Sequence, residues 1–143
     1  GAGILDMWEN LLLAGFLRLH ETGLGVARRG GPGQGYYYVR RAVECMMADL
    51  SRPHTTRELA DAAGVSQRTL QAGFQKCHGM GPAAFLRRER LKMVRADLAA
   101  ADPARAGVGD IAGKWGFYHL SHFTRQYRRQ FGELPSTTLA RSN

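Results

Sequence analysis

The sequence has little of what metal, redox or membrane proteins require. It contains two cysteines in 143 residues. Cys45 and Cys77 lie far apart and neither belongs to a C-x-x-C pair, which argues against a zinc site or a redox dithiol and favours two free thiols in a reducing cytosol. The apolar stretch 4–19 contains four polar or charged residues, so it is too short and too polar to span a bilayer, and no signal peptide is visible. We therefore expect a cytoplasmic protein with no membrane partner.

Motifs of catalysis are missing too. There is no phosphate-binding loop, no H-x-x-x-H and no G-x-S-x-G. A small enzyme or metal protein that uses His54, His78 and the cysteines is the alternative, and His119 and His122, at i and i+3 of a predicted helix, could hold a metal ion. That helix has another predicted role, described below. We predict no catalytic residue, no metal and no cofactor.

Acidic residues are scarce in the C-terminal part of the chain. The formal net charge is +8, and it is distributed unevenly. Residues 1–52 hold six Lys/Arg and five Asp/Glu, whereas residues 53–143 hold fourteen and seven. This distribution favours a polyanion such as nucleic acid as the partner of residues 53–143, and a solvated basic surface without a ligand is the alternative.

Within this basic region a short pattern occurs twice. Leu59-Ala60-Asp61-Ala62-Ala63-Gly64-Val65 is echoed by Ile111-Ala112-Gly113-Lys114-Trp115-Gly116-Phe117. Each copy is followed by two apolar residues four apart, then by a glycine and a proline: Leu70/Phe74, Gly79 and Pro82 in the first, Phe123/Tyr127, Gly132 and Pro135 in the second. Matching residues of the two copies are 52 positions apart in the first part of the pattern, up to Val65 and Phe117, and 53 positions apart from Leu70 and Phe123 onward. The repeat predicts one helical unit formed twice.

The periodicity is helical from residue 36 onward, with no sustained strand alternation, so we predict an all-α fold. Thr55 and Glu58 fit a capping box that opens a short helix, and Ser66 fits the N-cap of the next one. The predicted helices, in chain order, are 36–50, 55–64, 66–78, 82–101, 108 or 110–115, 119–131, and a short one from 135. In the first of these we expect Val39, Val43, Met46, Met47 and Leu50 to face inward.

Each copy meets the requirements of a helix-turn-helix, in which one helix supports a second that enters the major groove of DNA. A small residue is needed where the helices cross, and Ala60 and Ala112 supply it. A glycine is needed at the turn, where Gly64 and Gly116 tolerate a positive φ. The outward positions of the second helices then supply DNA contacts. We predict base contacts from Gln67, Arg68, Gln71, Leu120, Ser121, Thr124 and Arg125, and phosphate contacts from Thr56, Gln75, Lys114, Arg128 and Arg129.

Residues 36–140 resemble the DNA-binding domain of AraC/XylS-type transcription regulators. The resemblance is carried by Glu58-Leu59-Ala60-x-x-Ala63-Gly64-Val65-Ser66, Phe85-Leu86-Arg87-Arg88-x-Arg90-Leu91, Ile111-Ala112-x-x-Trp115-Gly116-Phe117 and Ser121-His122-Phe123-Thr124-Arg125-x-Tyr127-Arg128-Arg129-x-Phe131-Gly132 with Pro135. It implies two homeodomain-like, three-helix helix-turn-helix subdomains, 36–81 and 102–143, joined by a long central helix, 82–101. It also implies a regulator that inserts two recognition helices into adjacent major grooves of double-stranded DNA, with RNA polymerase as a further partner.

Two departures from the family pattern concern the recognition helices. Ala72 and Gly73 stand where the family commonly has a basic and then a bulky residue, and an interior glycine costs about 1 kcal/mol relative to alanine. Tyr118 stands where a capping Ser or Asp is usual. We therefore expect the second copy, with Arg125 at its centre, to contact bases more extensively than the first.

The N-terminal segment has a different composition. Residues 4–21 predict a helix that is apolar nearly all round and has to be buried against something, and residues 22–35 form a glycine-rich linker. We expect residues 1–21 to be a segment through which the protein forms a homodimer, or to be the end of a separate sensor domain. In the second case the chain would be a fragment of a longer regulator or a stand-alone module. A protein-interaction module whose main functional surface is this helix is the alternative to DNA binding.

Overall fold

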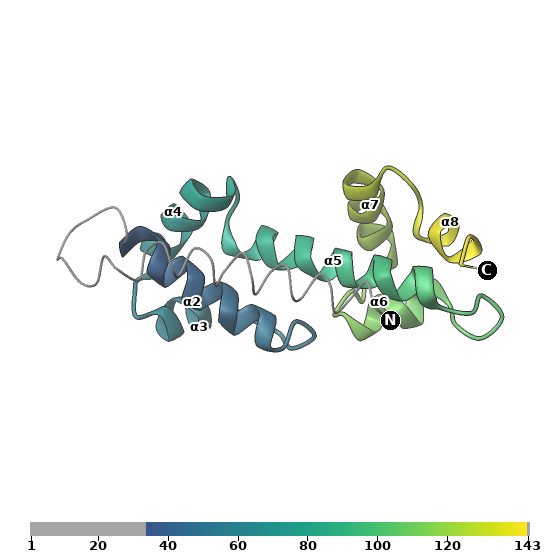
Figure 1. Cartoon of the computed structure of the whole chain (residues 1–143), viewed down its shortest axis with the longest axis horizontal. Coiled ribbons are helices and arrows are strands. Elements are labelled where there is room, and N and C mark those ends of the chain that lie inside the picture. The colour runs from purple at the N-terminus through teal and green to yellow at the C-terminus, as the bar shows by residue number, and fades with distance from the viewer. Residues whose placement is uncertain (1–33, 143) are drawn as a thin grey trace. The chain divides into compact units, whose positions relative to one another are not determined.

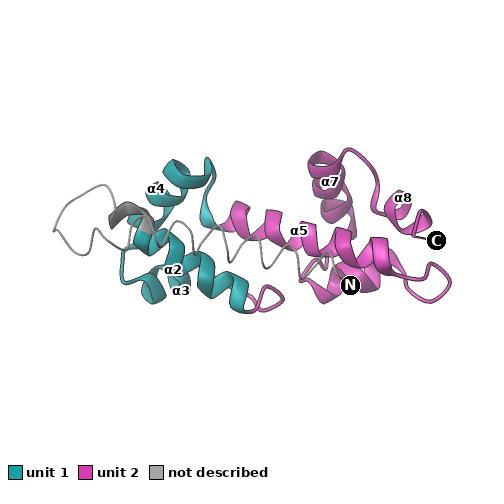
Figure 2. Cartoon of the chain, in the orientation of Figure 1, with its two compact units in different colours: residues 1–48, 54–82 teal, residues 49–53, 83–143 magenta. Residues whose placement is uncertain are grey.

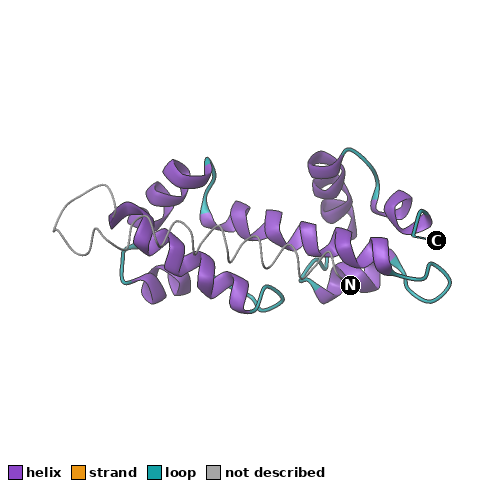
Figure 3. Cartoon of the chain, in the orientation of Figure 1, coloured by secondary structure: helices purple, strands orange, loops and turns teal. Residues whose placement is uncertain are grey.

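Every regular element of the described residues, 34–142, is a helix in the computed structural model (Figure 3). Figure 1 labels these helices, which are α2 (Gln34–Ala48), α3 (Thr56–Ala63), α4 (Gln67–His78), α5 (Pro82–Ala100), α6 (Val108–Lys114), α7 (Leu120–Phe131) and α8 (Pro135–Ala140). This confirms the all-α prediction. The predicted N-terminal helix and dimerisation segment, and residues 22–33 of the predicted linker, lie outside the described residues. No helix within 34–142 is long and apolar enough to cross a membrane.

The chain forms two compact units (Figure 2). Unit 1 contains residues 34–48 and 54–82, and unit 2 contains residues 49–53 and 83–142. The long helix was predicted to be a separate connector, whereas α5 belongs to unit 2 from residue 83 onward. The turn that follows α2 belongs to unit 2 as well, although the residues on either side of it belong to unit 1.

Unit 1 is a three-helix unit formed by α2, α3 and α4. The predicted capping box opens α3: the amide of Glu58 donates to Thr55 Oγ1 and the amide of Thr55 donates to Glu58 Oε2, both at 3.1 Å. Gly64 ends α3 with φ +72°, and Ser66 Oγ accepts from the amide of Thr69 at 3.1 Å to begin α4. Ala60, Leu70 and Phe74 are buried. The helix-turn-helix requirements read from the first copy are therefore met.

The inward face of α2 differs in detail from the prediction. Val39, Met46 and Met47 are buried as expected, but Ala42 is buried in place of Val43, which is half-buried. The helix ends at Ala48, two residues earlier than predicted, so Leu50 is buried from the following turn rather than from the helix. The predicted pattern was correct in period and slightly wrong in phase.

Gly73 has a packing role in unit 1 that the helix propensity of glycine does not indicate. A Cβ at this position would lie 2.5 Å from Tyr38 Cε2 and 2.8 Å from Val39 Cγ2, so these two side chains of α2 would have to shift to admit a larger residue. The intrinsic cost of an interior glycine is offset by this close contact. Tyr38 is therefore a packing residue of unit 1.

We expect Gly73→Ala to destabilise the protein by about 1–3 kcal/mol, because the overlap with Tyr38 and Val39 outweighs the gain of about 1 kcal/mol in helix propensity. Gly113→Ala is the matched control. A Cβ on Gly113, which lies in α6, meets nothing within 4 Å, so that variant should be neutral or more stable. Urea unfolding of both variants tests this, and equal stabilisation by both would contradict the close contact.

Unit 2 packs α6, α7 and α8 against α5. Its core contains Leu91, Val94, Leu98, Ile111, Ala112, Phe123, Tyr127 and Leu139. Gly116 lies in the turn between α6 and α7 with φ +87°, as the second copy of the repeat predicts. The N-cap of α7 is His119, one residue after Tyr118, and no side-chain capping bond forms there. The expectation that Tyr118 occupies the cap position was therefore wrong by one residue.

Arg90 of α5 joins three segments of unit 2. Its Nε donates to the carbonyl of Leu50 at 2.7 Å and its Nη2 donates to the carbonyl of Arg52 at 2.5 Å. Its Nη1 lies 3.1 Å from where a Cβ on Gly116 would stand. Burial lowers the pKa of the Arg90 guanidinium, which remains charged because an arginine in a protein is not deprotonated. One side chain thus anchors the 49–53 turn and fills the space beside the second helix-turn-helix turn.

A hydrogen-bonded chain fixes α7 to α8. Thr138 Oγ1 donates to Glu133 Oε1 at 2.6 Å, and it has a single proton, so the Tyr127 hydroxyl must be the donor in the 2.7 Å bond between Tyr127 and Thr138. Arg141 Nη2 also donates to Glu133. The bond from Thr138 and the charge of Arg141 hold the pKa of Glu133 below its ordinary value, and burial raises the pKa of the Tyr127 phenol. These hydrogen bonds position the inner face of α7 against α8.

Candidate nucleic-acid interface

The predicted base-contacting residues of the first copy lie on the exposed side of α4. Leu70, Gly73 and Phe74 form the buried side. Gln67, Arg68, Gln71 and Gln75 are all exposed, and the first three lie in the first half of the helix. Arg68 has no carboxylate within ion-pair distance among residues 34–142. Thr56 is the half-buried first residue of α3.

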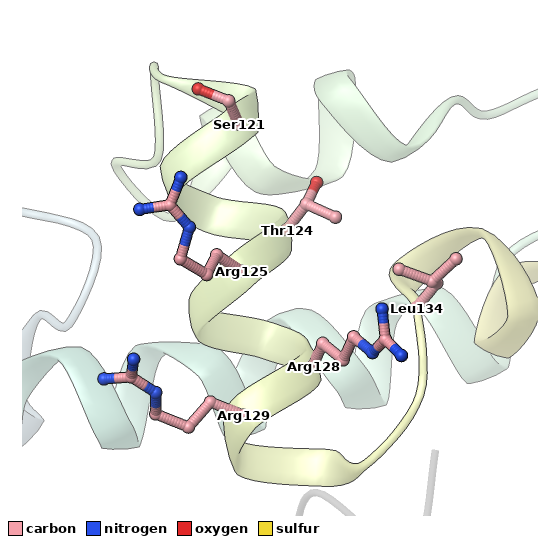
Figure 4. Close-up of a pocket in the computed structure, with 6 residues that line it drawn as sticks. All are labelled: Ser121, Thr124, Arg125, Arg128, Arg129 and Leu134. Carbon is pink, nitrogen blue, oxygen red and sulfur yellow. The ribbon is translucent and has the colours of Figure 1, made fainter.

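The second copy has a denser set of polar side chains on α7. Phe123 and Tyr127 form its buried side, while Ser121, Arg125, Arg128 and Arg129 are exposed and Thr124 is half-buried. Together with Leu134, these five residues line a shallow depression on the surface of unit 2 (Figure 4). Arg125 and Arg129 project to one side of the helix axis, and Thr124 and Arg128 project to the other, toward Leu134 (Figure 4).

The charge of this α7 surface is not compensated within the described part of the chain. The helix contains no Asp or Glu. None of its three arginines, Arg125, Arg128 and Arg129, has a carboxylate within 4.0 Å in residues 34–142. Side chains that donate several hydrogen bonds and have no internal anion are suited to bind phosphate oxygens or the acceptor atoms of guanine.

Lys114 differs from the other predicted phosphate contacts. Its Nζ lies 3.3 Å from Asp97 Oδ2, and the same oxygen accepts from Trp115 Nε1 at 2.8 Å. Asp97 of α5 therefore orients the end of α6 and neutralises part of the charge of Lys114. The Lys114 side chain is still 65% exposed, which leaves its other ammonium hydrogens accessible to an external acceptor.

Three exposed apolar residues lie at or beside the ends of α7. Leu120, 50% exposed, begins the helix, as predicted for a thymine contact, and Gly109 of α6 lies beside it. Tyr118 is 80% exposed in the preceding turn. Leu134, 40% exposed, was not among the predicted site residues. Its proximity to Arg128 depends on the path of the chain between α7 and α8, which no sequence pattern specifies.

The alternative of a histidine metal site finds no support in the described residues. Within 34–142 there is no group of three His, Cys, Asp or Glu side chains that could hold a metal ion. The rings of His119 and His122 lie 6.3 Å apart, edge to face. Neither Cys45 nor Cys77 forms a disulfide in this part of the chain.

Comparison with known proteins identifies the class of this fold. Residues 59–141 match the family model of a helix-turn-helix domain. The chain is 33% identical over 123 residues to the XylDLEGF operon transcriptional activator 2 of Pseudomonas putida, covering 86% of this chain and 78% of that protein. It is 43% identical over 101 residues to a probable thc operon regulatory protein of Rhodococcus erythropolis, covering 71% of this chain but 30% of that protein.

Solved structures specify the class further. A probable AraC family transcriptional regulator from Rhodopseudomonas palustris CGA009 superposes with a TM-score of 0.69 at 38% identity, covering 74% of this chain and 97% of that one. The DNA-binding domain of AdpA in complex with a target DNA superposes with a TM-score of 0.63 at 25% identity, covering 71% and 89%. The chain belongs to the AraC-type helix-turn-helix family. This is a family of transcription regulators and not of enzymes.

Proposed function

We propose that this chain is a sequence-specific double-stranded DNA-binding module of a transcription regulator, with α7 as its main base-contacting helix and α4 as a second one. The observation that carries the proposal is the exposed surface of α7, where Arg125, Arg128 and Arg129 have no acidic partner in the described residues. The AdpA domain, solved with its target DNA, supports the same use of the fold.

The two recognition helices have different roles in this proposal. On α7, Arg125 donates two bonds to a guanine, Ser121 and Thr124 contact bases, and Leu120 contacts a thymine methyl. Arg128 and Arg129 bind phosphates and fix the register of the helix. On α4, Arg68 and Gln71 contact bases beside Gln67, while Gln75 and Thr56 bind phosphate. We propose that the helices occupy adjacent major grooves, which a hydroxyl-radical footprint with two protected regions would support.

Relatives of this chain are named as operon activators, so we infer activation through RNA polymerase in the cytoplasm, on chromosomal DNA. We also infer that the protein forms a homodimer through the apolar segment 4–21. The test compares the mass in solution of the full chain with that of a chain that lacks residues 1–35. If the protein is a monomer both with and without these residues, the inference is wrong.

Binding sites selected from random DNA should converge on one sequence, and affinity for it should fall steeply with salt because phosphate contacts release counterions. Replacing Arg128 and Arg129 together by alanine should make the slope of log K against log salt shallower by about 1.8, at about 0.9 for each phosphate that is no longer neutralised. Fluorescence anisotropy over roughly the range from 50 to 200 mM salt measures the slope.

Arg105→Ala is the control for that measurement. Arg105 is 88% exposed in the loop between α5 and α6, where it pairs with Asp102 at 3.7 Å. Its loss removes one positive charge without touching α7, so the salt slope should stay as it is. A change with Arg105→Ala of about half that of the double variant, in proportion to the charge removed, would show that only net charge matters. A failure of the selection to converge would contradict sequence-specific binding.

A further inference from the structure

Two imidazoles at the start of α7 have no role in the function proposed above. His119 is the N-cap and His122 is the third residue of the helix, and both are exposed. Their rings lie edge to face with centroids 6.3 Å apart. His119 makes no capping bond to the helix, so the local fold does not require an imidazole at that position.

The position of His122 on the helix places it beside the arginines of the proposed interface. It precedes Arg125 by three residues and Arg129 by seven, which are spacings that put side chains on the same side of an α-helix. Arg125 and Arg129 project together from that side in Figure 4. His122 therefore extends the row of Arg125 and Arg129, a proposed base contact and a proposed phosphate contact, toward the N-terminal end of α7.

The described part of the chain supplies no anion for these imidazoles. No carboxylate lies within 4.0 Å of either ring in residues 34–142, and α7 has no Asp or Glu. The charged groups of the helices and turns packed against α7 are otherwise engaged. Asp110 accepts from the amide of Gly107, Lys114 pairs with Asp97, and Arg88 pairs with Glu89. Arg95 lies over the Phe131 ring, and Glu133 binds Thr138 and Arg141. Tyr118 is exposed in the turn before α7.

We propose that His122, with His119 beside it, is a proton-dependent contact to the DNA phosphate backbone. This inference rests on the proposed DNA binding and adds to it a dependence on pH. Histidine is the side chain whose charge ordinarily changes between pH 5 and 8. A phosphate oxygen next to an imidazole stabilises the protonated ring, so binding takes up protons. By linkage, the affinity for DNA increases as the pH falls and decreases as it rises.

The test measures affinity for the selected DNA site between about pH 5 and 8, the range in which histidine titrates, at constant ionic strength and with a chelator present so that no metal bridges the two rings. We expect the wild-type dissociation constant to rise with pH, by at most about tenfold per pH unit for each proton taken up. His122→Gln should remove most of this dependence, and His119→Gln combined with His122→Gln should remove all of it. At the alkaline end of the range these variants should bind as the wild type does.

His78→Gln is the matched control, because His78 lies in the last turn of α4 and packs against Phe74, with ring centroids 5.5 Å apart. It should retain the full pH dependence. Proton resonances of the imidazoles, recorded with and without DNA, give a second readout: those of His119 and His122 should shift when DNA is added.

Two results would overturn the inference, and they are distinguishable. If the double variant has the same pH dependence as the wild type, the protein binds DNA but these imidazoles are not contacts. If the wild type binds no DNA at any pH, the proposed function itself is wrong and the inference falls with it.

Discussion

Replacing Arg125 by alanine should weaken binding to the selected DNA site by about 1–3 kcal/mol, which corresponds to roughly 5- to 150-fold, and should leave binding to random DNA within a few-fold. Arg125 is exposed at the centre of the outward side of α7, without an acidic partner in the described residues. A bidentate contact to a guanine would lose two charge-assisted hydrogen bonds. Anisotropy titrations with the selected site and with random DNA measure both losses.

Arg129→Ala is the matched comparison, because Arg129 is one turn further along the same side of α7 (Figure 4). As a phosphate contact it should reduce the affinity for both DNAs by similar factors. If Arg125→Ala also weakens both DNAs equally, Arg125 is a phosphate anchor and the base contacts have to be assigned elsewhere on α7.

Tyr127→Ala should destabilise the protein by about 3–5 kcal/mol, the range found when a large buried aromatic side chain is truncated in a core. Tyr127 is fully buried in the core of unit 2, where its ring packs against Phe123 and Phe131. It lies on the inner side of the same helix that carries Arg125. Thermal and urea unfolding measure the loss, and DNA binding should disappear with the fold of unit 2.

Tyr127→Phe separates the ring from its hydroxyl. This variant keeps the packing and removes the bond to Thr138, so the expected loss is about 1 kcal/mol. Thr138 keeps its bond to Glu133, and DNA affinity should be close to that of the wild type. A phenylalanine variant as unstable as the alanine variant would show that the hydrogen-bonded chain, and not the ring, dominates at this position.

Features that depend on local sequence were predictable. The capping box at Thr55, the N-cap at Ser66 and the positive φ of Gly64 and Gly116 each follow from the chemistry of a few neighbouring residues, and the structure contains all of them. The outward side of α7 was predictable as well, since Phe123 and Tyr127 fix which side is buried.

Features that depend on contacts distant in sequence were not predictable. Gly73 looked unfavourable in a helix, because the Tyr38 ring that requires a glycine there lies thirty-five residues earlier in the chain. Lys114 was predicted as a phosphate contact with no partner in the protein indicated, because its partner Asp97 belongs to another helix. Leu134 entered the depression beside α7 through the path of a loop. In each case the local sequence indicates the conformational preference of a residue, and only the packing of the fold determines its contacts.

The bonds of Arg90 have a consequence for dividing this protein into parts. Unit 2 is discontinuous in sequence, because its 49–53 turn is separated from the rest of it by residues 54–82. A fragment that begins at residue 83 would keep the Arg90 guanidinium and lose its two carbonyl acceptors, Leu50 and Arg52. Water would then bind the guanidinium, and the fragment would lose two charge-assisted hydrogen bonds that join segments of unit 2. We therefore expect the second helix-turn-helix to be less stable when it is expressed from residue 83 or exchanged between regulators without the 49–53 turn. A fragment that begins before residue 49 retains the whole unit.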